Sequence, residues 1–119
     1  MDSAQTARWL RESSAAIAEK KDYLTQLDAA IGDADHGSNM TRGFAAVEQK
    51  LDELDGGTPP GRMLIAAGQT LVSTVGGASG PLWGTALRRA GRAMGDAEQV
   101  DDQGLIDALE AAVDGVVEL

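Results

Sequence analysis

The chain is built from stretches in which apolar residues recur at helical spacing, separated by breaks rich in glycine and proline. The clearest stretch covers about 39–54 and ends at Asp55-Gly56-Gly57. Its apolar face is formed by Phe44, Val47, Leu51 and Leu54. β-Branched residues are scattered and no run alternates apolar with polar residues for long, so strands are not expected. The pattern therefore predicts an all-α chain.

Six helices are expected in a single domain over residues 1–119. Their predicted ranges are about 3–20, 22–31, 39–54, 59–75, 81–94 and 104–117. Thr58 is the predicted N-cap of the fourth helix, with Pro59 and Pro60 in its first turn. The connections are short, which favours antiparallel neighbours and an up-and-down helical bundle. Alanine and glycine on the inner faces allow close approach of these helices.

Composition excludes several functions. The net charge of −9 argues against nucleic acid as a partner, because binding it requires a basic face. Cysteine is absent, so a metal would be held by oxygen ligands or by His36, the only histidine. No apolar run has the length of a signal peptide or a membrane span. A cytoplasmic protein is expected.

An acidic segment lies between the second and third predicted helices. Asp28 lies about 40° around the helix from Leu24 and about 60° from Ile31, inside an apolar stripe where a carboxylate needs a partner. Asp33 and Asp35 follow in a glycine-bounded turn. If the three carboxylates converge, their repulsion is relieved by a hard cation such as Mg²⁺. Alternatively, Asp33 and Asp35 are ordinary turn residues and Asn39 is a helix N-cap.

Other functional interpretations of this acidic segment fit the sequence less well. A calcium-binding EF-hand loop starting at Asp33 requires a ligand at 37, glycine at 38 and glutamate at 44. The sequence has Gly37, Ser38 and Phe44 there, so the match fails. A lone histidine such as His36 is usually structural or solvated, although in this loop it can donate to a phosphate oxygen. No Ser-His-Asp pattern indicates a nucleophile, and no catalytic residue is assigned.

A second motif, Gly76-Gly77-Ala78-Ser79-Gly80-Pro81, precedes the fifth predicted helix. Small residues let backbone N–H groups approach an anion, and the helix N-terminus adds its dipole. Neither a Walker A loop nor a Rossmann fingerprint is present. A plain helix–helix turn remains the alternative. In an up-and-down bundle this turn and the acidic segment lie at the same end, so together they indicate a combined metal and nucleotide site.

At these motifs the sequence resembles a known family, the ADP-binding L subunits (DhaL) of phosphoenolpyruvate-dependent dihydroxyacetone kinase. The nucleotide-binding domains of ATP-dependent dihydroxyacetone kinases are related to them. The resemblance spans essentially the whole chain. It is carried by Tyr23-Leu24-Thr25 with Leu27-Asp28, Ile31-Gly32-Asp33-Ala34-Asp35-His36-Gly37 with Asn39-Met40, Arg42-Gly43-Phe44, Val75-Gly76-Gly77-Ala78-Ser79-Gly80-Pro81-Leu82 with Gly84-Thr85, and Asp114-Gly115-Val116.

The resemblance implies an antiparallel barrel of eight helices with nucleotide at one end. Asp28, Asp33 and Asp35 correspond to the ligands of two Mg²⁺ ions. The residues that match ADP contacts are His36, Gly37, Ser38, Asn39, Ala78 and Ser79. In the family's bacterial form, a phosphohistidine on an M subunit phosphorylates bound ADP, and the resulting ATP phosphorylates dihydroxyacetone on a K subunit.

Family members are about twice as long as this chain, so the resemblance implies that helices beyond the first six are missing. The expectation is weak nucleotide binding by the chain alone and exposed apolar helix faces, covered by self-association or by a complementary C-terminal half. Two other functions stay open. One is the nucleotide domain of an ATP-using kinase for a triose or a related substrate, and the other is a non-catalytic helical fragment.

Overall fold

The computed structural model describes residues 1–119 apart from positions 31 and 33. Its described part is helical, with no strand, which confirms the predicted all-α class. The helices are α1 (Ser3–Glu19), α2 (Lys21–Ala29), α3 (His36–Glu53), α4 (Pro60–Thr74), α5 (Ser79–Met94) and α6 (Asp102–Val117). None of the helices in this part of the chain is long and apolar enough to cross a bilayer.

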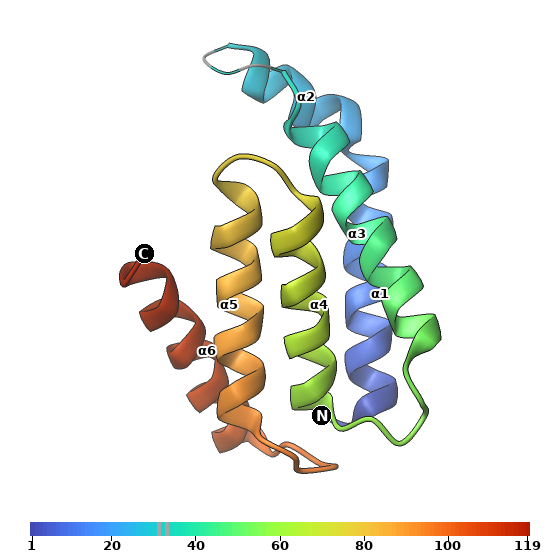
Figure 1. Ribbon diagram of the computed structural model, residues 1–119, viewed down its shortest axis with the longest axis vertical. Coiled ribbons are helices and arrows are strands. Elements are labelled where there is room, and N and C mark those ends of the chain that lie inside the picture. Colours follow the sequence, from blue (N-terminus) through green and yellow to red (C-terminus); the bar gives the residue numbers. More distant parts are fainter. Residues whose placement is uncertain (31, 33) are drawn as a thin grey trace.

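From α2 to α5 successive helices alternate up and down, whereas α2 continues away from the end of α1 instead of turning back along it (Figure 1). α4 and α5 lie side by side in the middle, and α6 flanks α5. On the other side of α4 lie α3 and α1, and α2 packs against the upper part of α3. The α2–α3 connection and the α4–α5 turn are consequently at the same end of the bundle, as the sequence predicts.

The helix starts show which sequence signals were reliable. Asp2 caps α1 in a capping box, because its carboxylate accepts from Gln5 N at 2.8 Å and the Gln5 side chain accepts from Asp2 N at 2.9 Å. The predicted cap at Thr58 is wrong. Pro59 is the N-cap of α4, and the Thr58 carbonyl instead accepts from Ser3 Oγ at 2.5 Å.

Two other helices begin earlier than predicted. α3 begins at His36 rather than near Asn39, and α5 begins at Ser79 rather than near Pro81. The alternative role of Asn39 as an N-cap is therefore wrong, since Asp35 holds that position. Neither Asp35 nor Ala78, the N-cap of α5, caps its helix with its own side chain.

The core lies between α1, α3 and α4, with contributions from α5 and α6. Leu10, Val47 and Leu71 are fully buried at its centre. The predicted face of α3 is confirmed: Phe44, Val47 and Leu51 are buried, and Leu54 packs against the core from its edge. Aliphatic side chains and methionine fill most of this volume, and Phe44 is its only buried aromatic residue in the described part of the chain.

α4 and α5 meet along a line of glycines that we call the glycine seam: Gly61, Gly68, Gly84 and Gly91. A Cβ atom added to Gly68 would lie 2.6 Å from the Gly84 carbonyl oxygen, and one added to Gly61 would lie 2.6 Å from the Gly91 carbonyl oxygen. Such distances are too short for real Cβ atoms. The two backbones are thus in contact, which confirms the predicted close approach.

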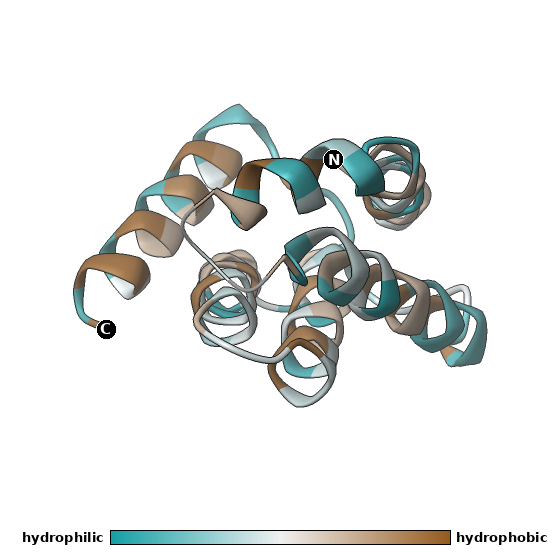
Figure 2. Ribbon diagram, turned by 90° about the horizontal axis from the view of Figure 1, so that it is seen from above, coloured by the Kyte–Doolittle hydropathy of each residue, from teal (hydrophilic) through white to brown (hydrophobic). Residues whose placement is uncertain are grey.

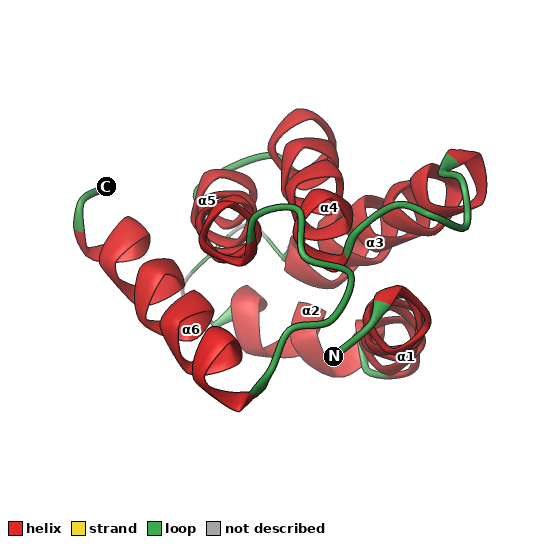
Figure 3. Cartoon of the chain, turned by 90° about the horizontal axis from the view of Figure 1, so that it is seen from below, coloured by secondary structure: helices red, strands yellow, loops and turns green. Residues whose placement is uncertain are grey.

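The opposite side of α5 is open. An apolar groove, here called the trough, has a volume of about 430 Å³ and runs between α1 and α6 with α5 at its base. Figure 3 shows α1 and α6 on its two sides, and Figure 2 shows hydrophobic residues recurring along α6. Its walls include Trp9, Trp83 and Leu109, which are 46%, 49% and 59% exposed. Leu105, Leu109 and Val113 recur at helical spacing along α6 but are 37%, 59% and 62% exposed, so the apolar face of this helix is largely uncovered.

Within the described part of the chain, α6 packs mainly against α5, and two hydrogen bonds between Met1 and Val100 hold the segment before it against the N-terminus. Gly115 is buried against α5, and a Cβ on it would lie 2.6 Å from Arg89 Cγ. Arg89 Nη1 donates to Glu118 Oε2 at 2.8 Å, and this hydrogen bond and the positive charge lower the pKa of the Glu118 carboxyl.

Candidate functional site

A polar cleft of about 250 Å³ lies at the end of the bundle where the α2–α3 connection meets the α4–α5 turn. One wall comes from α2 and the start of α3, and the other from the glycine-rich turn and the start of α5. The lining residues are Asp28, Asp35, His36, Asn39, Gly76, Gly77, Ala78 and Ser79. The two sequence motifs, more than forty residues apart, therefore form one site.

Asp28 holds the two parts of the acidic segment together. It lies in the last turn of α2, half-buried, and its Oδ2 accepts from the backbone N–H of Asp35 at 3.0 Å and of His36 at 3.3 Å. These N–H groups are at the N-terminus of α3, where a helix lacks its own acceptors and favours a negative charge. The partner that the sequence requires for Asp28 is thus the start of α3.

The cleft also joins two helix N-termini. His36 is the first residue of α3 and Ser79 is the first of α5. His36 Nδ1 and Ser79 Oγ are 3.3 Å apart, a hydrogen bond whose direction depends on the tautomer of the imidazole. Each helix presents the positive end of its dipole at this end of the molecule, so an anion is stabilised between them.

The glycine-rich turn offers backbone N–H groups as hydrogen-bond donors to a ligand. In the described part of the chain, the N–H groups of Gly76, Gly77 and Ala78 bond no acceptor. Gly77 has φ +69°, the left-handed region that glycine tolerates. An added Cβ at Gly76 or Gly77 would meet no atom within 4 Å, so space adjoins the backbone. Free donors beside a helix N-terminus suit phosphate oxygens.

The acidic side of the cleft brings together two of the three predicted metal ligands, Asp28 and Asp35. The third, Asp33, lies outside the described residues. Among those described, no group of three or more His, Asp or Glu side chains is placed to hold a metal ion. Two carboxylates with an open cleft suit Mg²⁺, which takes a few protein oxygens and completes its shell with water or phosphate.

Not every predicted nucleotide contact lines the cleft. His36, Asn39, Ala78 and Ser79 do, whereas Gly37 and Ser38 do not. Gly37 is buried against α2, where a Cβ would lie 2.5 Å from Thr25 Oγ1, and Ser38 is exposed. Gly76 and Gly77 line the cleft although they were not singled out as contacts. Ala34, beside the cleft, has φ 60°, an uncommon conformation for a residue with a Cβ.

The fold and site define a helical domain with two helix N-termini beside paired carboxylates. A family model described as "DAK2 domain" matches residues 30–119, so the chain belongs to the DAK2 domain family.

Three relatives illustrate this family. The chain is 41% identical over 109 residues to "PEP-dependent dihydroxyacetone kinase 1, ADP-binding subunit DhaL" of Listeria innocua, covering 92% of this chain and 54% of the relative. It is 41% identical over 113 residues to the corresponding subunit of Escherichia coli K12, covering 95% and 53%. It is 36% identical over 103 residues to "L-erythrulose 1-kinase" of Mycolicibacterium smegmatis, covering 86% and 18%. The chain spans about half the length of the DhaL relatives.

Proposed function

We propose that this chain binds ADP or ATP with Mg²⁺ in the polar cleft and acts as the nucleotide-binding part of a dihydroxyacetone kinase. The observation that carries the proposal is the meeting of the N-termini of α3 and α5, linked by His36 and Ser79, next to the carboxylates of Asp28 and Asp35. Phosphate oxygens match the helix ends, and a cation matches the carboxylates. Mg²⁺ would neutralise the phosphate charge, the main requirement of phosphoryl transfer.

The residues of the chain have distinct roles in this proposal. Asp28 stabilises the start of α3 and also faces the cleft. Together with Asp28, the carboxylates of Asp33 and Asp35 would provide the protein ligands of two Mg²⁺ ions. The backbone donors of Gly76, Gly77 and Ala78 and the side chains of His36, Asn39 and Ser79 would hold the phosphates. Gly37 and Ser38 do not line the cleft, but their backbone N–H groups belong to the first turn of α3 and would add to the positive end of that helix. No residue of this chain forms a covalent intermediate.

The partners follow from the same assignment. We propose that a dihydroxyacetone-binding K subunit accepts the phosphoryl group from the bound nucleotide and that a phosphohistidine-carrying M subunit restores it. Relatives named "PEP-dependent" and "PTS-dependent" DhaL subunits support this version. The named erythrulose kinases support a second candidate, the nucleotide domain of an ATP-using kinase for a related ketose. The cytoplasmic location stays a prediction.

Calorimetry tests the nucleotide site. The chain is expected to bind ADP with Mg²⁺ and to bind it at least tenfold more weakly when Mg²⁺ is removed, which is about 1.4 kcal/mol. Asp35→Asn is expected to produce a similar loss. Asp107→Asn, an exposed change on α6 that also removes one negative charge, serves as the matched control and should leave binding unchanged. Equal ADP binding with and without Mg²⁺ would contradict the metal part, and no ADP binding would favour a non-catalytic fragment.

We also propose that residues 1–119 are the first part of a larger nucleotide-binding domain, in which further helices cover the trough. The exposed apolar walls and the double length of the DhaL relatives support this. The chain alone is then expected to self-associate in sedimentation experiments, and Leu109→Gln should weaken that association. Adding the missing half from an L-subunit relative should give a one-to-one complex with tighter ADP binding. A monomer at high concentration with tight ADP binding would overturn the proposal.

A further inference from the structure

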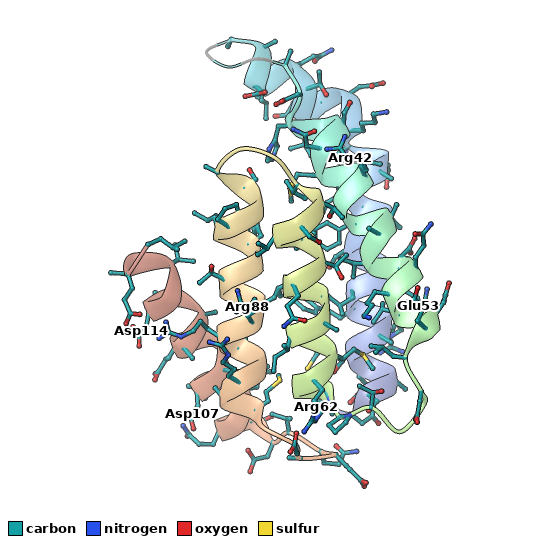
Figure 4. All side chains as sticks on the ribbon, viewed as in Figure 1. Arg42, Glu53, Arg62, Arg88, Asp107 and Asp114 are labelled. Carbon is teal, nitrogen blue, oxygen red and sulfur yellow. The ribbon has the colours of Figure 1, made fainter. Side chains whose placement is uncertain are left out.

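A positively charged side chain lies next to the cleft without lining it. Arg42 is on α3, one turn after Asn39, and Figure 4 shows it near the upper end of α4. Its Nη2 donates to Asn39 Oδ1 at 2.9 Å and to the Thr74 carbonyl at 3.3 Å. It forms no ion pair with any described carboxylate. The guanidinium group of Arg42 is therefore held in position by these two hydrogen bonds and not by an ion pair.

The position of Arg42 is set by close packing of α3 on the end of α4. A Cβ on the adjacent Gly43 would overlap Val75 and lie 3.2 Å from Leu71 Cδ2. Thr74 is the last residue of α4, and carbonyls in a final helical turn lack intrahelical donors. Arg42 supplies such a donor immediately before the glycine-rich turn begins. It thus connects the two segments that form the walls of the cleft.

The contact with Asn39 determines which end of its amide is available. A guanidinium has only donors, so the carboxamide must turn its oxygen toward Arg42. The Nδ2 group is then the free end, and no acceptor in the described part of the chain bonds it. Asn39 is half-buried and lines the cleft. A donor at this position matches an anionic ligand, whereas the flipped amide would present an oxygen.

We propose that Arg42 is a positioning residue for the nucleotide site. It holds the Asn39 amide with its NH₂ group available to a phosphate oxygen and anchors that donor to the end of α4. This role rests on the nucleotide binding proposed above. It differs from a direct role of the Arg42 charge, because it acts only through Asn39.

A double-mutant cycle separates the two roles. Arg42→Ala and Asn39→Ala are each expected to weaken binding of ADP with Mg²⁺ about tenfold, and the double variant no more than either, a coupling of about 1.4 kcal/mol. Arg92→Ala is the control, since it removes an exposed arginine from the last turn of α5 at the other end of the bundle. Multiplied losses of about 100-fold in the double variant would overturn the proposal.

A nucleotide-free measurement tests the contact itself. Asn39 is the only asparagine, so selective ¹⁵N labelling gives one side-chain amide pair in an NMR spectrum. Arg42→Ala should shift that pair and Arg92→Ala should not. An unmoved pair overturns the role of Arg42 regardless of nucleotide. Failure of the unaltered chain to bind ADP would refute the proposed function together with this role, whereas binding with an additive cycle would refute the role of Arg42 alone.

Discussion

The glycines of the seam and those of the turn between α4 and α5 occupy opposite environments. At Gly68 a Cβ would collide with the Gly84 carbonyl, whereas at Gly76 and Gly77 it would meet nothing within 4 Å. In the seam, glycine is needed because the backbone of the facing helix lies directly against it, so that the two helices pack through their backbones. In the turn it is needed for its conformation or for an approaching ligand. Seam substitutions should therefore reduce stability through steric collision, whereas turn substitutions should act through backbone conformation at Gly77 and through ligand binding at Gly76.

The largest expected effect is in the seam. Gly68→Val would force branched atoms against the Gly84 carbonyl and the Arg88 side chain, since even a Cβ lies 2.6 Å from each. We expect a loss of about 3 kcal/mol in the free energy of unfolding, measured by urea denaturation. Gly56→Ala is the control: its Cβ would meet no neighbour, so a change within about 0.5 kcal/mol is expected. Similar losses for both would show that the seam is not tightly packed.

A smaller loss of stability is expected at Gly77. Its φ of +69° is unfavourable for a residue with a Cβ, so Gly77→Ala should cost about 1 kcal/mol without any steric collision. The same denaturation experiment measures it. Gly77→Asn should cost less, because asparagine tolerates this region better than alanine. An alanine variant as stable as the original would show that the turn adopts another conformation in solution.

The smallest expected effect on stability is at Gly76, where the free energy of unfolding and the binding of ADP should respond most differently. Gly76→Ala should change the free energy of unfolding by no more than about 0.5 kcal/mol, since the site is open and φ is not positive. If phosphate oxygens approach this backbone, the added methyl group should still weaken binding of ADP with Mg²⁺, as measured by calorimetry. Unchanged binding would remove Gly76 from the proposed phosphate site.

The sequence alone predicted the number and approximate ranges of the helices, and it placed the two motifs at one end of the bundle. Periodicity identifies the face of α3 that contains Val47, and chain direction alone brings the glycine-rich turn to the acidic segment. The start of α3 was missed because its stabilising carboxylate comes from Asp28, eight residues before His36 and on another helix. Local signals describe a cap within a few residues and do not register one supplied from a different element.

Two other features could be recognised only from the three-dimensional structure. The contact of Arg42 with Thr74 joins residues 32 positions apart, which no spacing rule anticipates. The apolar stripe through Leu105 and Leu109 is visible in the sequence, but periodicity cannot show whether another element covers it. Leu71 and Leu109 look alike in such a pattern, although the first is fully buried and the second is 59% exposed.

The single histidine and the two tryptophans give this molecule natural spectroscopic reporters at separate places. The imidazole of His36 lies in the cleft, and the indoles of Trp9 and Trp83 both line the trough. Proton NMR of the imidazole can therefore follow ligand entry, while indole fluorescence follows loss of water from the apolar walls. Without any added label, one sample can report whether the two events occur together or independently.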